Sequence, residues 1–373
     1  MRKYITIVLL LLTVITFAQS DTKSQKNVLI IVSSYGKDNG DTRPGFEFEE
    51  FVDAYNIFRA NNLEVTVASP KGGKVVADKF DATNEKNSAF LSNRNTSSIL
   101  KQTEATADVD AANFDAIYII GGKGAMFDIP YDASLQDIIL NLYDRENTVL
   151  SSVCHGSSAF VNVKHKNKYI LDNERITGFS NAEEHIFKSK WINEFPFFLE
   201  DALKSRGAIY HKTSFMLENV VISGKFITGQ NPASTKVSAE AVVNALGVKP
   251  VQRAITKQEV TLTFIKNFIN SQLGVNALQK DSNADSYNYK LIATYGFILI
   301  QNAKDNKERL EKGVGLITFS KPYFFNENFQ LLVAKTQLKL QKTKHAKITL
   351  EELLEKDLLK EEAITLLIGI TKS

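Results

Sequence analysis

The fold is decided by the stretch Val149-Leu150-Ser151-Ser152-Val153-Cys154-His155-Gly156-Ser157-Ser158-Ala159. It predicts a short buried strand that runs into a small-residue turn opening a helix, with the only cysteine of the chain at the corner. Such a turn pushes its side chain out of the sheet, and the N–H groups and dipole of the helix below favour a thiolate. We therefore expect Cys154 to be a nucleophile with a lowered pKa, and His155 to add charge or relay a proton. The alternative to a catalytic pair is that Cys154 is a small buried hydrophobic residue and His155 a turn residue, as is common for an isolated Cys-His pair.

A glycine-rich turn precedes this stretch. Residues 115–120 form another apolar strand, which ends in Gly121-Gly122-Lys123-Gly124-Ala125-Met126-Phe127-Asp128. Glycines after a strand let backbone N–H groups face a ligand, and the N–H after a nucleophile completes an oxyanion hole. Here the donors would be the amides near Gly122 and of His155. The oxyanion or substrate-binding residues that we predict are Gly121, Gly122, Lys123 and Gly124.

From residue 27 onwards, short apolar strands alternate with amphipathic helices, which is typical of a parallel sheet covered on both faces. The elements that we expect are strands at 28–33, 63–69, 115–120 and 149–153, a strand pair within 169–177, a hairpin at 219–229, and helices at 46–61, 86–102, 133–146, 196–206 and 232–246. In the last helix, Asn231 is the expected N-cap and Pro232 takes the first helical position.

Five motifs together carry a family resemblance. They are the glycine turn 121–128, Val153-Cys154-His155-Gly156, Thr177-Gly178-Phe179-Ser180-Asn181-Ala182-Glu183-Glu184, Pro196-Phe197-Phe198-Leu199-Glu200-Asp201 and Thr228-Gly229-Gln230-Asn231-Pro232-Ala233-Ser234. The combination resembles the PfpI superfamily of class I glutamine amidotransferase-like folds, and within it the glyoxalase III and heat-shock chaperone branch. The resemblance implies a flavodoxin-like α/β three-layer sandwich with a mostly parallel sheet, and a loop at Thr177-Gly178-Phe179 that lies over the active site.

The resemblance also assigns a role to Glu50. Its motif, residues 45–51, matches the place from which a glutamate reaches the nucleophilic cysteine in the family. A carboxyl group beside a thiolate is expected to be at least partly protonated, so that it can donate a hydrogen bond or shuttle a proton. From the residues alone, Glu50 would be one more solvated acid at a helix start.

The chain departs from the family pattern at two positions. Lys123 stands where a histidine is usual, so a cation near the thiolate would replace part of the electrostatic effect of an imidazole. Ser157 stands where a proline often follows, which we expect to be harmless. The remaining histidines show no metal-ligand spacing, and we predict neither a metal nor a cofactor.

The first residues indicate export. A basic start, an apolar run over residues 5–17 and a small-residue end have the three parts of a signal peptide, with cleavage expected after Ala18. We therefore expect a secreted or periplasmic protein that is not membrane-bound after cleavage. An uncleaved anchor is the alternative, although the apolar run is shorter than the about 20 residues of a membrane span. One cysteine excludes an intramolecular disulfide, and a net charge of +3 over 373 residues indicates no nucleic-acid partner.

The length of the chain suggests two domains. We divide it into a signal peptide at 1–18, the PfpI-type domain at 27–248, a helix and linker at 249–288 and an all-α domain at 289–373. Expected helices there cover 249–274, 289–304, 307–320, 328–341 and 349–371. Some pieces resemble degenerate tetratricopeptide helices, and an ordinary helical bundle is the alternative.

The resemblance implies an enzyme of the glyoxalase III or lactate dehydratase type. Cys154 would add to a small 2-oxoaldehyde such as methylglyoxal, and His155 and Glu50 would move protons to give a hydroxy acid without glutathione. Deglycase or chaperone activity could accompany it. The alternatives are a cysteine amidohydrolase or peptidase, and a non-catalytic chaperone or redox sensor. A protein partner at the C-terminal helices and a homodimer are open expectations.

Overall fold

The structure is a computed structural model that describes residues 25–271 and 285–371. The predicted signal peptide lies outside the described residues, as does part of the predicted linker. Within the described ranges, no helix is both long and apolar enough to cross a membrane.

The described residues form one seven-stranded sheet, and its strands are β1 Asn27–Ile31, β2 Glu64–Ser69, β3 Glu104–Ala105, β4 Ala116–Ile119, β5 Val149–Val153, β10 Val220–Ser223 and β11 Phe226–Gly229. Their order is β10-β11-β5-β4-β1-β2-β3. All neighbours are parallel except the hairpin of β10 and β11. The central strands β4 and β5 are buried along their whole length, as continuous apolar runs predict.

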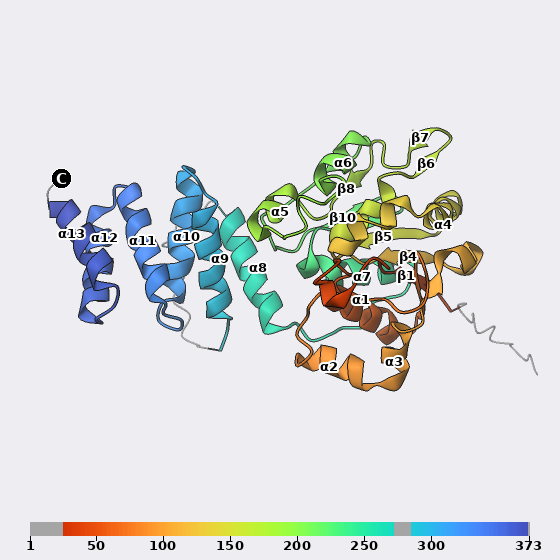
Figure 1. Ribbon diagram of the computed structural model, residues 1–373, viewed down its shortest axis with the longest axis horizontal. Coiled ribbons are helices and arrows are strands. Elements are labelled where there is room, and N and C mark those ends of the chain that lie inside the picture. Colours follow the sequence, from red (N-terminus) through yellow and green to blue (C-terminus); the bar gives the residue numbers. More distant parts are fainter. Residues whose placement is uncertain (1–24, 272–284, 372–373) are drawn as a thin grey trace, which may run out of the picture.

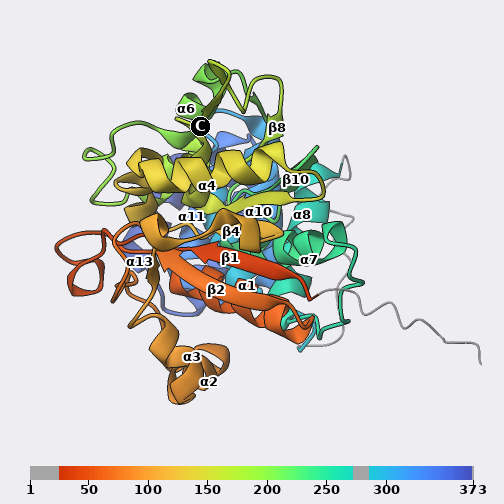
Figure 2. The same cartoon turned by 90° about the vertical axis from the view of Figure 1, so that its right-hand side faces the viewer.

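Helices cover both faces of this sheet, which confirms the predicted mostly parallel α/β sandwich. In Figure 2, α4 Ala133–Asp144 lies above the strands and α1 Phe48–Ala60 lies on their other side, where it contacts α7 Thr235–Ala245. The apolar side of α1 packs on the sheet because Phe51, Ala54 and Phe58 recur at helical spacing and are fully buried. Tyr55, one turn after Phe51, is only partly buried.

Several shorter elements differ from the sequence prediction. The helix expected at 86–102 is divided into α2 Glu85–Ser92 and α3 Arg94–Ile99, because the side chain of Asn93 caps the second helix. The strand pair expected within 169–177 is wrong, since its halves pair elsewhere: β7 Lys168–Tyr169 with β6 Lys164–His165, and β8 Arg175–Ile176 with β9 Ile209–Tyr210. The remaining helices of this part are α5 Asn181–Phe187 and α6 Leu199–Ser205.

Short 3₁₀ helices connect several of these elements. They are Asp38–Gly40, Thr106–Asp108, Ala111–Asn113, Lys123–Met126, Ile129–Tyr131, Cys154–Phe160 and Pro232–Ser234. Asn231 precedes the last of them, but its side chain does not act as the expected helix cap. Its amide group donates to Glu183 instead, at 2.8 Å.

The C-terminal part is a row of helices that extends away from the sheet (Figure 1). Its elements are α8 Lys257–Asn270, α9 Tyr289–Gln301, α10 Lys307–Ser320, α11 Glu327–Lys339, α12 Thr343–Glu355 and α13 Lys360–Thr371. The predicted all-α character is confirmed. The single helix expected at 349–371 is wrong, because Asp357 and Leu359 have φ angles of 63° and 45° and end α12 before α13 begins. The tetratricopeptide likeness stays a prediction.

The helical part is joined to the α/β part by an apolar and polar junction. The ring of Phe215 stacks on that of Tyr295 in α9, with centroids 4.3 Å apart, and the Tyr295 hydroxyl bonds Ser214 Oγ at 2.8 Å. An ion pair of 2.7 Å links Lys266 in α8 to Glu218. Helix α8, predicted to belong to a linker region, is therefore part of the junction.

Two glycines set the spacing between α9 and α10. A Cβ atom added to Gly296 would lie 2.7 Å from the carbonyl oxygen of Gly313, and one added to Gly313 would lie 2.9 Å from the carbonyl oxygen of Gly296. Gly369 in α13 has nothing within 4 Å of the same position. Only the first two glycines are therefore needed for close packing.

Replacing Gly296 should destabilise the helical part, and replacing Gly369 should not. We expect Gly296→Ala to lower the free energy of unfolding by about 1–3 kcal/mol, because the methyl group meets backbone. Gly369→Ala, the matched control, should be neutral or raise it by up to about 1 kcal/mol through helix propensity. Urea denaturation followed by circular dichroism measures both, and equal effects would contradict the close packing.

Candidate active site

Cys154 lies at the end of β5 in an unusual backbone conformation. Its φ angle is 57°, in the left-handed region that costs a non-glycine residue roughly 1–2 kcal/mol. The chain then enters the seven-residue 3₁₀ helix Cys154–Phe160, and not the α-helix that the sequence predicts. Gly156 permits this sharp turn, because a Cβ atom there would lie 2.3 Å from the carbonyl oxygen of Ile119. The result is a strained strand-to-helix corner that carries the only thiol of the chain.

His155 links the thiol to a second acid. Its Nδ1 atom lies 3.4 Å from Cys154 Sγ, and its Nε2 atom lies 2.7 Å from Glu184 Oε1. Both side chains of the His155–Glu184 pair are almost fully buried. Because a carboxylate can only accept, Nε2 carries the proton, and in the neutral ring Nδ1 is free to accept the thiol proton. Cysteine, histidine and glutamate therefore form a chain with the order of a catalytic triad.

Sequence reasoning did not find Glu184. It lies 29 positions after His155, in the first turn of α5, and the sequence analysis assigned it no role. The available signal was the capping box of Ser180 and Glu183 directly before it, which fixes the start of α5. That signal places Glu184 in a helix start but does not indicate that it points to His155.

Glu50 reaches the thiol from the other side, as the resemblance implies. It lies in the first turn of α1, is 1% exposed, and its Oε2 atom accepts the Gly121 N–H at 2.9 Å. Burial, together with the charge of Glu47, raises the pKa of the Glu50 carboxyl well above its usual range, although hydrogen bonds from Gly121 and Cys154 oppose this. Burial therefore favours the protonated form of Glu50. Among the described residues, its Oε1 atom has no hydrogen-bond partner.

The thiol does not have the lowered pKa that the sequence suggested. Burial first, and the nearby Glu50 second, raise the pKa of Cys154 well above its usual value. The backbone N–H of His155 favours the thiolate, as expected of the residue after a nucleophile, but this effect is smaller. The prediction was wrong because desolvation of a buried thiol outweighs the donors at the corner. The thiol therefore needs a base, and His155 is in place to be one.

The glycine turn lies directly against the nucleophile. A Cβ atom at Gly121 would be 2.6 Å from Cys154 Cβ and 2.9 Å from the His155 nitrogen, so only glycine fits. The N–H groups of Gly121 and Gly124 are already used, by Glu50 and by the Gly45 carbonyl oxygen. Gly122, with a φ angle of 94°, donates to none of the described residues. The N–H groups of Gly122 and His155 are thus the oxyanion donors that the geometry favours.

Lys123 is held by acids at the edge of the site. Its Nζ atom lies 3.3 Å from Asp78 Oδ2, and its side chain is 36% exposed. Burial alone would lower the pKa of Lys123, but Asp78, Glu47 and the thiolate form of Cys154 raise it overall. Burial raises the pKa of Glu47 to about 7. The cation acts on Cys154 at a distance and makes its ion pair with Asp78.

Ser157, in place of the usual proline, connects the corner to the loop above it. Its Oγ atom donates to the Thr177 carbonyl oxygen at 2.9 Å and contacts Ser152 Oγ at 2.8 Å. The loop then returns over the site: the Phe179 N–H donates to the Cys154 carbonyl oxygen at 3.2 Å, and the Phe179 ring lies 4.5 Å from the His155 ring. The loop therefore covers the site as the resemblance implies.

Glu183, next to Glu184, is a buried anchor for the whole region. Its two oxygens accept five hydrogen bonds, from Ser180 N and Oγ, Met216 N, Gln230 Nε2 and Asn231 Nδ2. This network explains why two motifs far apart in the sequence, 177–184 and 228–234, occur together. It fixes the start of α5 and hence the position of Glu184.

The other histidines lie away from this site. His165 is 3.1 Å from Asp144, and His185 packs on Phe198. Among the residues that the structure describes, no group of three or more His, Cys, Asp or Glu side chains is arranged to hold a metal ion.

The chain belongs to the DJ-1/PfpI family, whose profile matches residues 42–245. A glutathione-independent glyoxalase of Schizosaccharomyces pombe is 29% identical over an alignment of 255 residues, and this alignment covers 59% of this chain and 98% of that protein. Glyoxalase 3 of Candida albicans is 27% identical over 58% of this chain and 97% of its own length.

Solved structures of similar proteins share the fold of this part of the chain. The crystal structure of glyoxalase III from Candida albicans has 25% identity and a TM-score of 0.54, over 59% of this chain and 97% of the other. Rapid Encystment Protein 24 KDa of Francisella tularensis has 32% identity and a TM-score of 0.56, over 60% of this chain and 99% of the other. Almost the full length of these proteins corresponds to about three fifths of this chain, and the family match ends before α8.

The coupling of Glu50 to the thiol predicts a shift in the pH dependence of Cys154 alkylation. Because a negative Glu50 raises the thiol pKa, Glu50→Gln should lower the pH midpoint of iodoacetamide alkylation. Glu49→Gln is the matched control, since Glu49 is half-exposed and faces Lys86. An unchanged or higher midpoint in Glu50→Gln would contradict the coupling.

Proposed function

We propose that this protein converts 2-oxoaldehydes such as methylglyoxal to 2-hydroxy acids without glutathione or another cofactor. The observation that carries the proposal is a buried thiol with a histidine base on one side, oriented by Glu184, and on the other side a buried carboxyl group whose pKa is raised. The names of the relatives, glutathione-independent glyoxalase and glyoxalase 3, support it.

The first step is addition of the thiol to the aldehyde. Cys154 gives its proton to His155 Nδ1, and Glu184 stabilises the imidazolium through Nε2. The sulfur forms a bond to the aldehyde carbon, and the carbonyl electron pair moves to the oxygen. Glu50 protonates this oxygen beside the N–H groups of Gly122 and His155, which gives a hemithioacetal and leaves Glu50 as a carboxylate.

The second step moves hydrogen between the two carbons. The Glu50 carboxylate removes the proton on the former aldehyde carbon, while His155 protonates the neighbouring ketone oxygen, which gives an enediol. Glu50 then returns the proton to the second carbon, and His155 takes the hydroxyl proton of the first. One carbon is oxidised and its neighbour is reduced, so no external oxidant is needed. The product is a thioester of a 2-hydroxy acid.

Hydrolysis closes the cycle. Water attacks the thioester carbon and gives a proton to Glu50, the carbon–sulfur bond breaks, and the leaving sulfur takes the proton held by His155. The 2-hydroxy acid leaves, and all three side chains return to their starting state. Overall, one oxoaldehyde and one water molecule are converted to one hydroxy acid.

Glu50 also separates this reaction from the alternative of amide hydrolysis. An amidohydrolase needs a thiol, a base and an oxyanion hole. A protonated carboxyl group across the thiol from the base is needed when protons must move at two adjacent carbons. A role as chaperone or redox sensor, export through the first residues, a protein partner at the C-terminal helices and a homodimer stay predictions of the sequence.

The test is methylglyoxal consumption and lactate formation by the protein without glutathione or added metal. Cys154→Ala should abolish turnover, and Glu50→Gln and Glu184→Gln should each lower kcat by about 10²–10⁴-fold. Asp137→Asn, the control at an exposed acid on α4, should stay within about twofold. Full activity of Cys154→Ala would refute the proposal, and cleavage of amides with no action on glyoxals would favour the amidohydrolase.

A further inference from the structure

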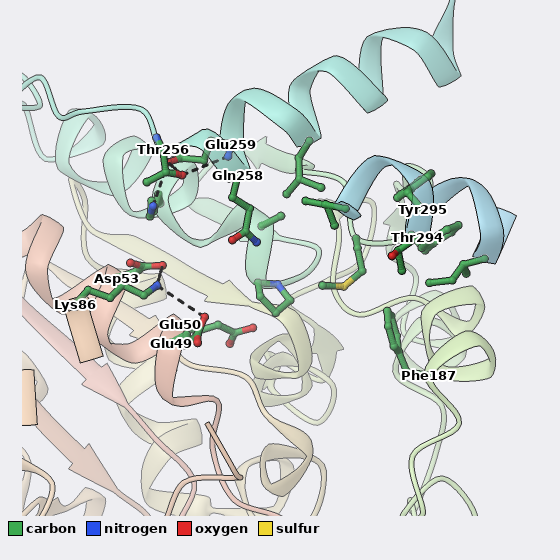
Figure 3. A pocket seen from close by; sticks show the side chains of 18 residues that line it. Glu49, Glu50, Asp53, Lys86, Phe187, Thr256, Gln258, Glu259, Thr294 and Tyr295 are labelled. Carbon is green, nitrogen blue, oxygen red and sulfur yellow. Dashed lines mark hydrogen bonds and ion pairs between the residues drawn. The ribbon is translucent and has the colours of Figure 1, made fainter. Parts of the chain in front are cut away.

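A cleft of about 280 Å³ lies between the α/β part and the helical part (Figure 3). On one side, Glu49, Glu50 and Asp53 of α1 form its floor. On the other side, α8 and α9 supply Leu262, Leu291, Thr294 and Ile298, and the loop before β10 supplies Phe215 and Met216. The cleft therefore exists only because the helical part packs against the family domain.

The cleft adjoins the catalytic corner at two points. Glu50 lines it, and the same carboxyl group accepts from Gly121, whose Cα lies against Cys154. The second oxygen of Glu50 is buried and lacks a hydrogen-bond partner among the described residues, as expected of a group whose partner arrives with a ligand. Phe187 lines the cleft and is labelled in Figure 3. Its ring centroid lies 6.3 Å from that of Phe179, and the Phe179 ring in turn packs on the His155 ring.

The wall formed by α8 and α9 is an addition to the family domain. The family match ends at residue 245, and the yeast relatives align over nearly their whole length with less than three fifths of this chain. The lining residues Leu262, Leu291 and Ile298 lie beyond that match. The names of the relatives therefore do not describe a property that depends on this wall.

The chemistry of the walls selects an uncharged, apolar group. Two pairs of charged side chains in the lining already neutralise each other: Lys86 pairs with Asp53 at 2.7 Å, and Lys236 with Glu259 at 3.1 Å. A charged ligand would compete with these pairs, whereas the leucine, isoleucine, phenylalanine and methionine side chains gain by covering an apolar surface. The space is sufficient for an aromatic ring, since an apolar cavity of about 150 Å³ holds benzene.

We propose that this cleft binds the apolar substituent of the substrate, so that the enzyme prefers aryl- or long alkyl-substituted 2-oxoaldehydes to methylglyoxal. The inference rests on the proposed function for its chemistry. The aldehyde end would lie between Cys154 and Glu50, the ketone oxygen would face His155, and the ring or chain would extend past Glu50 between α1 and α9.

The experiment compares phenylglyoxal with methylglyoxal in the full chain. Thr294→Phe fills the cleft from α9, and Gln301→Phe adds the same ring at an exposed position of the same helix as the control. We expect the wild-type protein to have the higher kcat/KM for phenylglyoxal. Thr294→Phe should raise the KM for phenylglyoxal about tenfold or more and leave methylglyoxal and both kcat values within about twofold, because only the binding of the substituent is lost.

Equal losses for both substrates, or no loss for phenylglyoxal, would overturn the inference and leave the proposed function intact. If the wild-type protein turns over neither aldehyde, the proposed function fails, and a binding measurement then tests the cleft. In that case 1-phenylpropane-1,2-dione, which has no aldehyde, is titrated into the Cys154→Ala protein by calorimetry. The cleft would be supported as a site for the substituent if Thr294→Phe weakens this binding about tenfold and Gln301→Phe leaves it unchanged. No binding, or binding that ignores Thr294→Phe, would overturn it.

Discussion

The left-handed backbone of Cys154 is the constraint on which the site depends. A φ angle of 57° at a non-glycine residue persists only when the surroundings fix it, and here they do so from three sides. Gly121 and Gly156 leave room for the corner, and the Phe179 N–H holds its carbonyl oxygen. Because β4 and β5 are neighbours in the sheet, the glycine turn and the corner end at the same edge. Glu50, His155 and the two oxyanion donors are then placed around one sulfur atom by the backbone itself.

Burial sets the chemistry of this sulfur. Cys154 and Glu50 are both taken out of water, so the pKa of each is raised, and burial disfavours two negative charges on the pair. A thiolate that formed freely would meet oxidants and adventitious electrophiles. In this arrangement the charge appears only when His155 accepts the proton, and the resulting imidazolium is balanced by Glu184. The raised pKa therefore favours the protonated thiol until His155 accepts its proton.

The sequence allowed the sheet, the corner and the helical character of the C-terminal part to be predicted, because each depends on local apolar patterns and on glycine. Glu50 needed the family resemblance, since an acid in an acidic helix start has no local mark. Glu184 could not be predicted, because its contact with His155 depends on how the loop returns over the corner. The pKa direction of Cys154 was wrong because burial follows from the whole fold and not from the corner. The break between α12 and α13 was missed because Asp357 and Leu359 are not glycines.

The anchor at Glu183 has a mechanical consequence. One of its five donors is the backbone of Met216, and the preceding residue, Phe215, stacks on Tyr295 in the helical part. The residue after Glu183 orients the catalytic histidine. A short path through one ring contact, one hydrogen bond and two peptide links therefore connects the helical row to the proton relay. Loosening of that row would be felt at the histidine before the central sheet lost any of its own contacts, and the two parts should behave as one cooperative unit and not as a domain with an independent appendage.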